Sequence, residues 1–437
     1  MPSRLAFMLR ALRHRNYRLF FGGQVVSLTG SWITLTATSW LVYRLTGSAL
    51  VLGVVGFAGQ FPGFITGAFA GAYIDRWDRH KLLLWTQGIS MVQSFALAAL
   101  TLTDHITVGA IIALNAVQGV VNAFDMPARQ VFLVNMISDK EDLVNAIALN
   151  SSMFNAARLV GPSIAGVVIA ASSEGTCFLI DGVSYFAVLI ALLLMRDISQ
   201  SRRPPGTVGV LAQFEEGLRY VYGFRPIRSL MLLLATVSLL GVPYSVLMPV
   251  FATGVLGGGP STLGLLMTAT GMGALTGALW LAARKSVVGL GRVILFATTL
   301  FGAGLIAFSF SRVLWLSVLL LLVAGFGMMV QFASSNTVIQ TLVDDEKRGR
   351  VMSFYTMCFL GTAPFGSLIA GSLSARIGAP HTVLISGICC LIAAGWFSRE
   401  LPEIRSLVRP IYVRMGILPE VATGLQSASQ LMTPPED

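Results

Sequence analysis

The sequence predicts an all-α membrane protein with twelve transmembrane helices in two pseudo-symmetric halves of six helices each. Three observations predict this fold class. The chain of 437 residues is 55% hydrophobic and only 11% charged, whereas soluble domains carry about 25% charged residues. Apolar runs of about 18 residues or more, long enough to cross a hydrocarbon core of roughly 30 Å, recur along the whole chain. Segments about half a chain length apart also share residues at matching positions.

The twelve apolar runs are expected to be helices, because backbone groups in lipid must form hydrogen bonds within their own segment. They lack the alternating pattern of a membrane β-strand. Residues 1–18 are basic and lead directly into a span too long for a signal peptide, so no cleaved signal is expected. The expected spans cover residues 19–43, 49–74, 81–103, 106–130, 142–171, 176–196, 228–254, 261–283, 290–310, 313–340, 348–376 and 380–398.

The basic residues place both termini in the cytoplasm. With the amino terminus inside, all but four of the 30 lysines and arginines fall on the cytoplasmic side. The exceptions are Arg44, Arg312 and Arg376, which fall outside, and Arg158, which falls within a span. We therefore expect a multi-pass protein of the bacterial cytoplasmic (inner) membrane. The net charge of +10 follows from this topology, so no nucleic-acid partner is expected.

A weak internal repeat divides the spans into two sets of six. Under one constant shift of about half the chain, Asp139 aligns with Asp344, and Ile164–Gly166 aligns with Ile369–Gly371. Apolar residues at helical spacing over 207–224 predict an amphipathic helix on the cytoplasmic membrane surface, unless this segment is a mere spacer. The expected domains are an amino-terminal half (1–196), a cytoplasmic linker (197–227), a carboxyl-terminal half (228–399) and a cytoplasmic tail (400–437).

A charged stretch, GAYIDRWDRHK at residues 71–81, interrupts two uncharged spans. Its residues Gly71, Asp75, Arg76 and Arg79 have the spacing G-x-x-x-D-R-x-x-R. A carboxylate at Asp75 can lie against the positive amino-terminal end of a neighbouring helix. The stretch is therefore either part of a conformational gate or a positively charged turn that only sets the topology.

This stretch resembles the loop signature G-x-x-x-D-R-x-G-R-[RK] between helices 2 and 3 of the major facilitator superfamily, whose architecture consists of parallel six-helix halves. The resemblance implies that Asp75 faces the helix that begins near Glu346. Arg76 and Arg79 would then brace a latch that closes the cytoplasmic side. One position departs from the signature, because Asp78 stands where the family usually has glycine.

A second signature lies in the fifth span, where Gly161-Pro162-x-x-x-Gly166 resembles the glycine–proline motif of helix 5 in facilitator antiporters. Proline kinks a helix, and glycine lets another helix approach closely. The alternative is a kink that serves packing alone. With these two stretches, the segments 41–43, 45–48 and 348–353 resemble the enterobactin-exporter-like drug and siderophore efflux branch, over about residues 15–400.

Polar residues follow one helical face in several spans, and such a face is unfavourable toward lipid. The resemblance implies that helices 1, 4, 7 and 10 line a central cavity. The alternative is hydrogen bonding between helices of a packed bundle. The residues expected to line the substrate cavity are Gln24, Ser31, Thr34, Asn115, Gln118, Asn122, Asn155, Arg158, Tyr244, Gln331 and Asn336.

Three ionisable residues within spans are candidates for proton coupling: Asp125, Asp181 and Arg158. Arg158 lies about 16 residues into its helix, close to the membrane midplane at 1.5 Å per residue. It pairs with Asp181 for structural reasons, or else it serves substrate binding or proton coupling. Asp125 has a natural ion-pair partner four residues on, in Arg129.

Together these patterns predict a secondary active exporter that exchanges an amphipathic small molecule, a drug or a siderophore, for protons by alternating access. The alternatives are a transporter of lysophospholipid and a non-transporting scaffold or receptor. The four cysteines and four histidines lack ligand spacing, so no metal is expected. A phosphate-binding GxxxxGK[ST] loop and a nucleophile–base set are absent, so neither a cofactor nor an enzyme is expected. The expected partners are the substrate, protons and membrane lipids, with the chain as a monomer.

Overall fold

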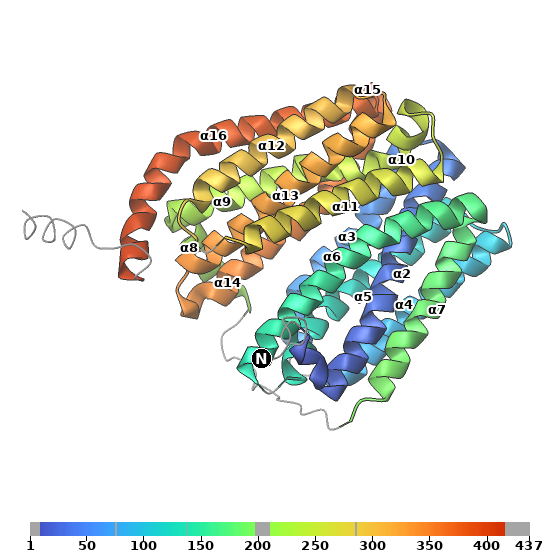
Figure 1. The fold of residues 1–437 in the computed structure, drawn as a ribbon, viewed down its shortest axis with the longest axis horizontal. Coiled ribbons are helices and arrows are strands. Elements are labelled where there is room, and N and C mark those ends of the chain that lie inside the picture. The colour runs from blue at the N-terminus through green and yellow to red at the C-terminus, as the bar shows by residue number, and fades with distance from the viewer. Residues whose placement is uncertain (1–8, 75–76, 138, 197–209, 285, 416–437) are drawn as a thin grey trace, which may run out of the picture.

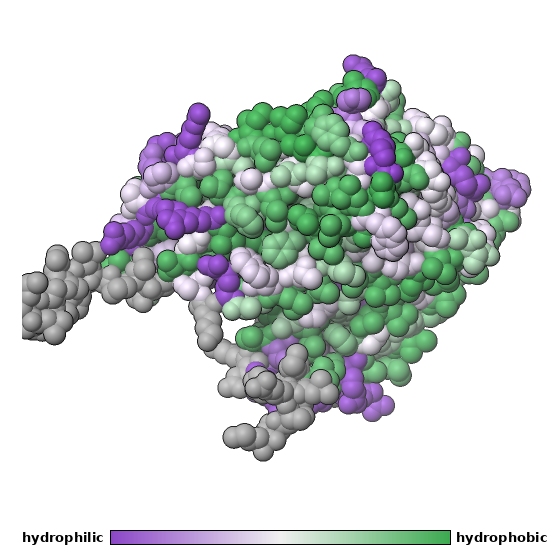
Figure 2. Space-filling model, turned by 45° about the horizontal axis from the view of Figure 1, so that its top comes forward, coloured by the Kyte–Doolittle hydropathy of each residue, from purple (hydrophilic) through white to green (hydrophobic). Residues whose placement is uncertain are grey.

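The computed structural model describes residues 9–74, 77–137, 139–196, 210–284 and 286–415. Every regular element in these ranges is a helix, and twelve helical segments there are long and apolar enough to cross a membrane. The chain is therefore a multi-pass helical membrane protein, as the composition predicts. Figure 2 shows an apolar surface across the middle of the molecule, with hydrophilic residues gathered toward its ends.

The amino-terminal half consists of a short 3₁₀-helix and six long helices. These elements are η1 (Arg10–Arg13), α2 (Arg15–Thr46), α3 (Ala49–Ile74), α4 (Arg79–Leu102), α5 (Val108–Asn135), α6 (Lys140–Ala171) and α7 (Glu174–Leu193). Gly47 ends α2 in the left-handed conformation, with a φ of 60° that favours glycine. Thr107 and Ser173 begin α5 and α7 as side-chain caps. We call the end of the bundle where α2 begins the basal end, and the opposite end the distal end.

The carboxyl-terminal half follows the linker helix α8 (Val210–Gly223) and contains two interrupted spans. The seventh span comprises α9 (Arg225–Thr236), the π-helix η2 (Val237–Gly241), the 3₁₀-helix η3 (Val242–Leu247), α10 (Met248–Val250) and the π-helix η4 (Phe251–Val255). The eleventh span comprises α14 (Asp345–Thr356), the π-helix η5 (Met357–Gly361) and α15 (Ala363–Ile377). The other spans are α11 (Pro260–Ala282), α12 (Leu290–Phe310), α13 (Leu314–Leu342) and α16 (Ala379–Arg414).

The interruptions of the seventh and eleventh spans are connected. Pro243 and Pro249 lie within the seventh span and cannot donate backbone hydrogen bonds. The Ser238 hydroxyl in η2 donates a hydrogen bond to the backbone carbonyl of Phe359 in η5. A backbone acceptor in one π segment is therefore satisfied by a side chain from the other. The sequence predicts both spans as continuous helices and does not reveal this link.

The last helix is longer than expected, because α16 continues past residue 398 to Arg414. The apolar residues Leu401, Ile404, Val408 and Tyr412 recur at helical spacing and are buried. These residues continue the buried face of α16 beyond the predicted span, which ends at residue 398. At its base, Arg225 forms ion pairs with Glu400 and Glu403, and its Nε lies 3.0 Å from a Glu400 carboxylate oxygen.

The linker helix expected over 207–224 is present as α8, and it packs against α14. Gly217 lies against the Phe354 ring, and the Lys347 Nζ lies 4.8 Å from the centre of the Tyr220 ring. Tyr222 and Leu218 remain exposed. The helix therefore contacts the start of the eleventh span and also presents apolar side chains outward.

The two halves form a V in Figure 1, with the amino-terminal half in blue to green and the carboxyl-terminal half in yellow to red. They meet mainly where α6 crosses α11 and where α3 crosses α15. At each crossing, a glycine of one half packs directly against a glycine of the other half. A Cβ on Gly166 would lie 3.2 Å from the Gly264 Cα, and a Cβ on Gly371 would lie 2.8 Å from the Gly53 Cα. Both crossings are near the distal end, and the ribbons diverge toward the basal end.

These crossings explain the internal repeat of the sequence. Gly166 and Gly371 are the residues that the repeat aligns, and each one faces a glycine near the start of a helix in the other half. The aligned segments are thus the two symmetry-related contacts between the halves. Close approach of helix backbones is the physical reason for small residues at both places.

The distal crossing predicts that Gly371→Ala destabilises the protein. The new Cβ would lie 2.7 Å from the Ala49 carbonyl oxygen, so α3 and α15 must separate. Overpacking of this kind costs about 1–3 kcal/mol. Thermal unfolding in detergent measures the effect, with Gly88→Ala as the control, because a Cβ at Gly88 meets nothing within 4 Å. Equal melting temperatures for the two variants would contradict this role of the crossing.

Candidate functional site

The predicted cavity residues fall into groups with different surroundings. Ser31 and Thr34 on α2 bond to α7 of the same half: the Ser31 hydroxyl lies 3.3 Å from the Tyr185 hydroxyl, and Thr34 donates to Asp181 at 2.8 Å. Gln118 on α5 donates to the Ser90 hydroxyl on α4 at 3.1 Å. For these three residues, the hydrogen bonds connect neighbouring helices of the amino-terminal half.

A second group bonds within its own helix. Asn115 and Asn155 each donate to the backbone carbonyl four residues before. Asn122 and Asn336 each accept from a glutamine four residues away, Gln118 and Gln340 respectively. All four asparagines are partly or fully exposed. Their amides therefore keep hydrogen-bonding capacity for other groups.

A third group is buried with polar atoms that have no partner among the described residues. Gln24 on α2 is 1% exposed, and neither its amide nitrogen nor its oxygen is bonded. On α13, the Gln331 carbonyl oxygen and the Ser334 hydroxyl are in the same situation. Buried amides are nearly always hydrogen-bonded in folded proteins. These atoms therefore mark polar positions inside the bundle that are suited to water or a ligand.

Asp181 on α7 is buried among hydroxyl groups. Its carboxylate accepts hydrogen bonds from Thr34 at 2.8 Å and from Ser94 at 2.7 Å, and it packs directly against Gly30. The ion pair with Arg158 that the sequence allows is not formed: no cation contacts Asp181 within the described part of the chain. The carboxylate is thus held by neutral donors from α2 and α4.

Asp125 on α5 has different partners. Arg129, one turn further along the helix, forms an ion pair with it, which confirms the pairing predicted from the sequence. Thr86 and Gln87 on α4 donate to the other carboxylate oxygen at 2.8 Å and 2.7 Å. Protonation of Asp125 would break an ion pair, whereas protonation of Asp181 would not.

Arg158 on α6 lies over the ring of Trp32 on α2, with its guanidinium carbon 5.8 Å from the ring centre. Phe154, one turn earlier on α6, meets the same ring edge-on at 5.9 Å. A cation–π contact contributes about 0.5–2 kcal/mol, whereas an arginine at the bilayer centre costs at least about 2.5–3.5 kcal/mol. The Trp32 ring therefore does not fully compensate this charge.

The glycine–proline motif lies at the junction of the halves. A Cβ on Gly161 would lie 2.4 Å from the Trp32 Cβ, so α6 and α2 are in close contact there. The carbonyl of Pro162 and the backbone of Gly166 face Gly264 on α11. The motif thus packs one helix against both a neighbour in its own half and a helix of the other half.

In the charged stretch, Asp75 and Arg76 lie outside the described residues, and Gly71 lies in α3. The buried Arg79 opens α4, while α14 begins at Asp345, where the expected partner helix starts. Asp78, which departs from the loop signature, is the cap of α4. Its carboxylate accepts hydrogen bonds from the backbone amides of His80 at 3.0 Å and Lys81 at 3.1 Å. An aspartate at this position satisfies amides that a glycine cannot.

The sequence does not reveal an ionic cluster at the basal end, which surrounds one buried carboxylate. Asp142 on α6 is 2% exposed and contacts His14 at 2.7 Å and the Arg13 Nε at 2.8 Å. Asp139 contacts the same arginine at 2.9 Å. His14, Asp139 and Asp142 lie close enough together to hold a metal ion, but arginine already neutralises both carboxylates. The cluster connects η1 to α6, and its partners lie too far apart in sequence for spacing to indicate them.

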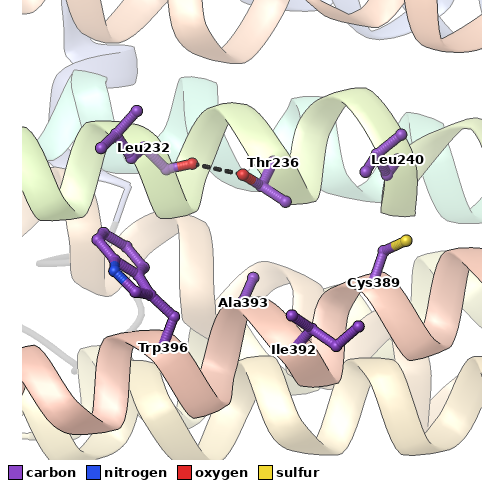
Figure 3. Close-up of a pocket in the computed structure, with 7 residues that line it drawn as sticks. All are labelled: Leu232, Thr236, Leu240, Cys389, Ile392, Ala393 and Trp396. Atoms are coloured by element: carbon purple, nitrogen blue, oxygen red, sulfur yellow. Dashed lines mark hydrogen bonds between the residues drawn. The ribbon is translucent and has the colours of Figure 1, made fainter.

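A shallow groove lies between the seventh span and α16 (Figure 3). Leu232, Thr236 and Leu240 face Cys389 and Trp396 across it. The Thr236 hydroxyl donates to the Leu232 carbonyl of its own helix, and Leu232 is half exposed. The groove is thus apolar and open to the outside of the bundle. It contains no residue of the predicted substrate cavity.

The cap at Asp78 yields a prediction for the loop. Asp78→Ala removes the acceptor for two backbone amides and weakens the first turn of α4 by about 0.5–2 kcal/mol, whereas Asp78→Ser retains a cap. Hydrogen–deuterium exchange of the peptide covering residues 79–82 measures this directly. We expect faster exchange in Asp78→Ala and exchange close to wild type in Asp78→Ser. Equal protection in all three proteins would refute the capping role.

Similarity to known proteins agrees with this architecture. The chain resembles the staphyloferrin A transporter of Staphylococcus aureus, with 28% identity over 88% of this chain and 96% of that protein. It is also 28% identical to the multidrug efflux pump Tap of Mycolicibacterium fortuitum, covering 86% of this chain and 93% of the pump. The macrolide efflux protein A of Streptococcus pyogenes is 24% identical over 90% of this chain and 99% of its own length.

Solved structures share the fold at low identity. A bacterial homolog of the human lysosomal transporter Spinster, in an inward-facing and unoccupied conformation, matches with a TM-score of 0.70 and 14% identity, covering 90% of this chain and 98% of that one. The nucleoside transporter NupG matches with a TM-score of 0.69 and 16% identity, covering 89% and 99%. Residues 7–411 match the family described as transmembrane secretion effector. The chain therefore belongs to this family of the major facilitator superfamily and is a membrane transporter, not an enzyme.

Proposed function

We propose that this transporter exports an amphipathic small molecule, a drug or a siderophore, from the bacterial cytoplasm in exchange for protons. The main support is the arrangement of the halves, which touch at the distal end and diverge toward the basal end. Most basic loop residues belong to the basal end, which favours the cytoplasm on that side. In this assignment both termini are cytoplasmic, and the substrate enters from the cytoplasm. Alternating access would then open the two glycine crossings.

The direction of transport is inferred from the relatives. Two of the three relatives described above are named as efflux proteins, and the third is named as a siderophore transporter. The chain covers more than nine tenths of each relative's length. The same relatives favour a small-molecule substrate over a scaffold or receptor role.

Proton coupling is assigned to Asp181. Deep within the spans, carboxylates occur in the amino-terminal half, at Asp125 and Asp181. Asp125 is held by Arg129, whereas Asp181 receives hydrogen bonds from neutral hydroxyl groups. Asp181 can gain or lose a proton without breaking an ion pair. Its donors come from α2 and α4, so a change in its protonation would alter the packing of three helices.

Transport into proteoliposomes under an imposed pH gradient tests this proposal, with a siderophore, a macrolide and a lysophospholipid as candidate substrates. We expect gradient-driven accumulation of a siderophore or a macrolide. Transport of the lysolipid alone would replace the proposed substrate class. A folded protein that moves none of the three would refute export of these classes.

The coupling residue has its own test. Asp181→Asn should abolish accumulation against a gradient while leaving downhill exchange of substrate measurable, because the amide keeps the shape of the site but cannot carry a proton. Glu215→Gln on the exposed face of α8 serves as the matched control and should transport like wild type. If Asp181→Asn still concentrates substrate under the pH gradient, Asp181 is not the proton carrier.

A further inference from the structure

We propose that Arg158 binds a carboxylate of the transported molecule, so that the substrates of this protein are amphipathic carboxylic acids. This inference rests on the proposed export function and specifies its substrate class. It follows from the charge balance inside the bundle, the position of Arg158 between the halves, and the aromatic rings beside it.

Arg158 has no counter-ion among the described residues. Each carboxylate of the amino-terminal spans whose side chain the structure describes already has other partners. Asp125 is paired with Arg129, Asp181 accepts from Thr34 and Ser94, Glu174 is paired with Arg44 at 2.7 Å, and Asp142 is paired with Arg13. In the carboxyl-terminal half, residues 225–343 and 347–399 include no acidic residue. Its acidic residues before Glu403 are Asp344–Glu346, at the start of the eleventh span, and Glu400, at the base of α16. Arg158 therefore has no carboxylate partner in this part of the chain.

Arg158 lies on a turn of α6 that packs against the opposite half. The backbone carbonyl of Arg158 lies against Gly271 on α11, so this turn of α6 is at the interface of the halves. The carbonyl of the next residue, Leu159, accepts a hydrogen bond from Thr268 on α11 at 3.4 Å. The Arg158 guanidinium extends to Trp32 on α2. A charge between the two halves is where a transported ion can contact both of them. A charge that only stabilised one half would be expected inside that half.

The surroundings of Arg158 suit a ligand that combines a carboxylate with an apolar body. The guanidinium carbon lies 5.8 Å from the centre of the Trp32 ring, and arginine presents a fork of N–H donors that suits a planar anion. Arginine binds carboxylates through two parallel hydrogen bonds. Trp32 and Phe154 also provide apolar surface for the rest of the ligand. An uncompensated arginine repels cationic molecules, so the same group selects against cationic drugs.

One test requires no ligand. If Arg158 is an unpaired binding group, Arg158→Gln removes an uncompensated charge from within the span, and the empty protein should melt at the wild-type temperature or above it. Arg44→Gln is the comparison, because it leaves the buried Glu174 without its partner and should lower the melting temperature. If Arg158→Gln lowers the melting temperature as much as Arg44→Gln does, Arg158 is structural and the inference fails.

A second test uses a matched pair of fluorescent amphipathic probes, rhodamine B with a free carboxylate and its ethyl ester, rhodamine 3B. Fluorescence anisotropy reports their binding to the purified full chain in detergent. We expect Arg158→Gln to weaken binding of the acid at least about tenfold, while Arg158→Lys retains part of the affinity. Binding of the ester should not weaken in Arg158→Gln. If the wild-type protein does not prefer the acid, or if Arg158→Gln binds it as tightly as wild type, the inference is overturned.

These outcomes separate the inference from the proposed function. Arg158-dependent binding of the acid without gradient-driven transport would uphold the carboxylate site and refute proton-coupled export. Gradient-driven export of a macrolide that is unaffected by Arg158→Gln would uphold export and refute the carboxylate site. Binding of lysophosphatidylglycerol in preference to rhodamine B would also overturn the inference, because it would assign the arginine to a phosphate.

Discussion

The close contact of backbones at the two glycine crossings is the constraint on which the rest of this structure depends. Gly166 with Gly264, and Gly371 with Gly53, bring helices of opposite halves together without side chains between them. Such contacts gain dispersion energy from backbone atoms. Beside the first crossing, the hydroxyls of Ser163 on α6 and Thr268 on α11 also form a hydrogen bond between the halves at 2.6 Å. Backbone packing therefore brings the halves close at both crossings, and a polar contact reinforces the one between α6 and α11.

The polar interior of the bundle is unevenly divided between the halves. Among the described residues of the amino-terminal half, the buried carboxylates are Asp125, Asp142, Glu174 and Asp181. Of these, Asp125 and Asp181 accept hydrogen bonds from hydroxyl and amide donors on α4. The carboxyl-terminal half contributes neutral groups such as Gln331 and Ser334. In the proposed transport cycle, coupling chemistry is therefore expected in the first half, and the second half is expected to contribute neutral polar groups. The pseudo-symmetry of the backbone does not extend to the charges.

Much of the fold could be predicted from the sequence because membrane spans are recognisable from length and hydropathy alone. The twelve helices, the linker helix and the Asp125–Arg129 pair depend on local patterns, and the structure confirms them. The surroundings of Asp181 could not be predicted, because its donors come from two other helices whose rotations no local pattern specifies. The same holds for Ser31 and Thr34, where a polar stripe indicates a buried face but not which neighbour it meets. The cap at Asp78 was within reach of the sequence, since aspartate before a helix is a common capping signal.

The hydrogen bond from Ser238 to Phe359 gives the carboxyl-terminal half a distinct mechanical character. Straightening the seventh span would take the Ser238 donor away from the Phe359 carbonyl, and straightening the eleventh would take the acceptor away from the Ser238 hydroxyl. The bond therefore favours joint deformation of the two spans. The Lys347 side chain at the start of the eleventh span also contacts Tyr220 of α8. Bending of the eleventh span would therefore be felt by the linker helix as well as by the seventh span.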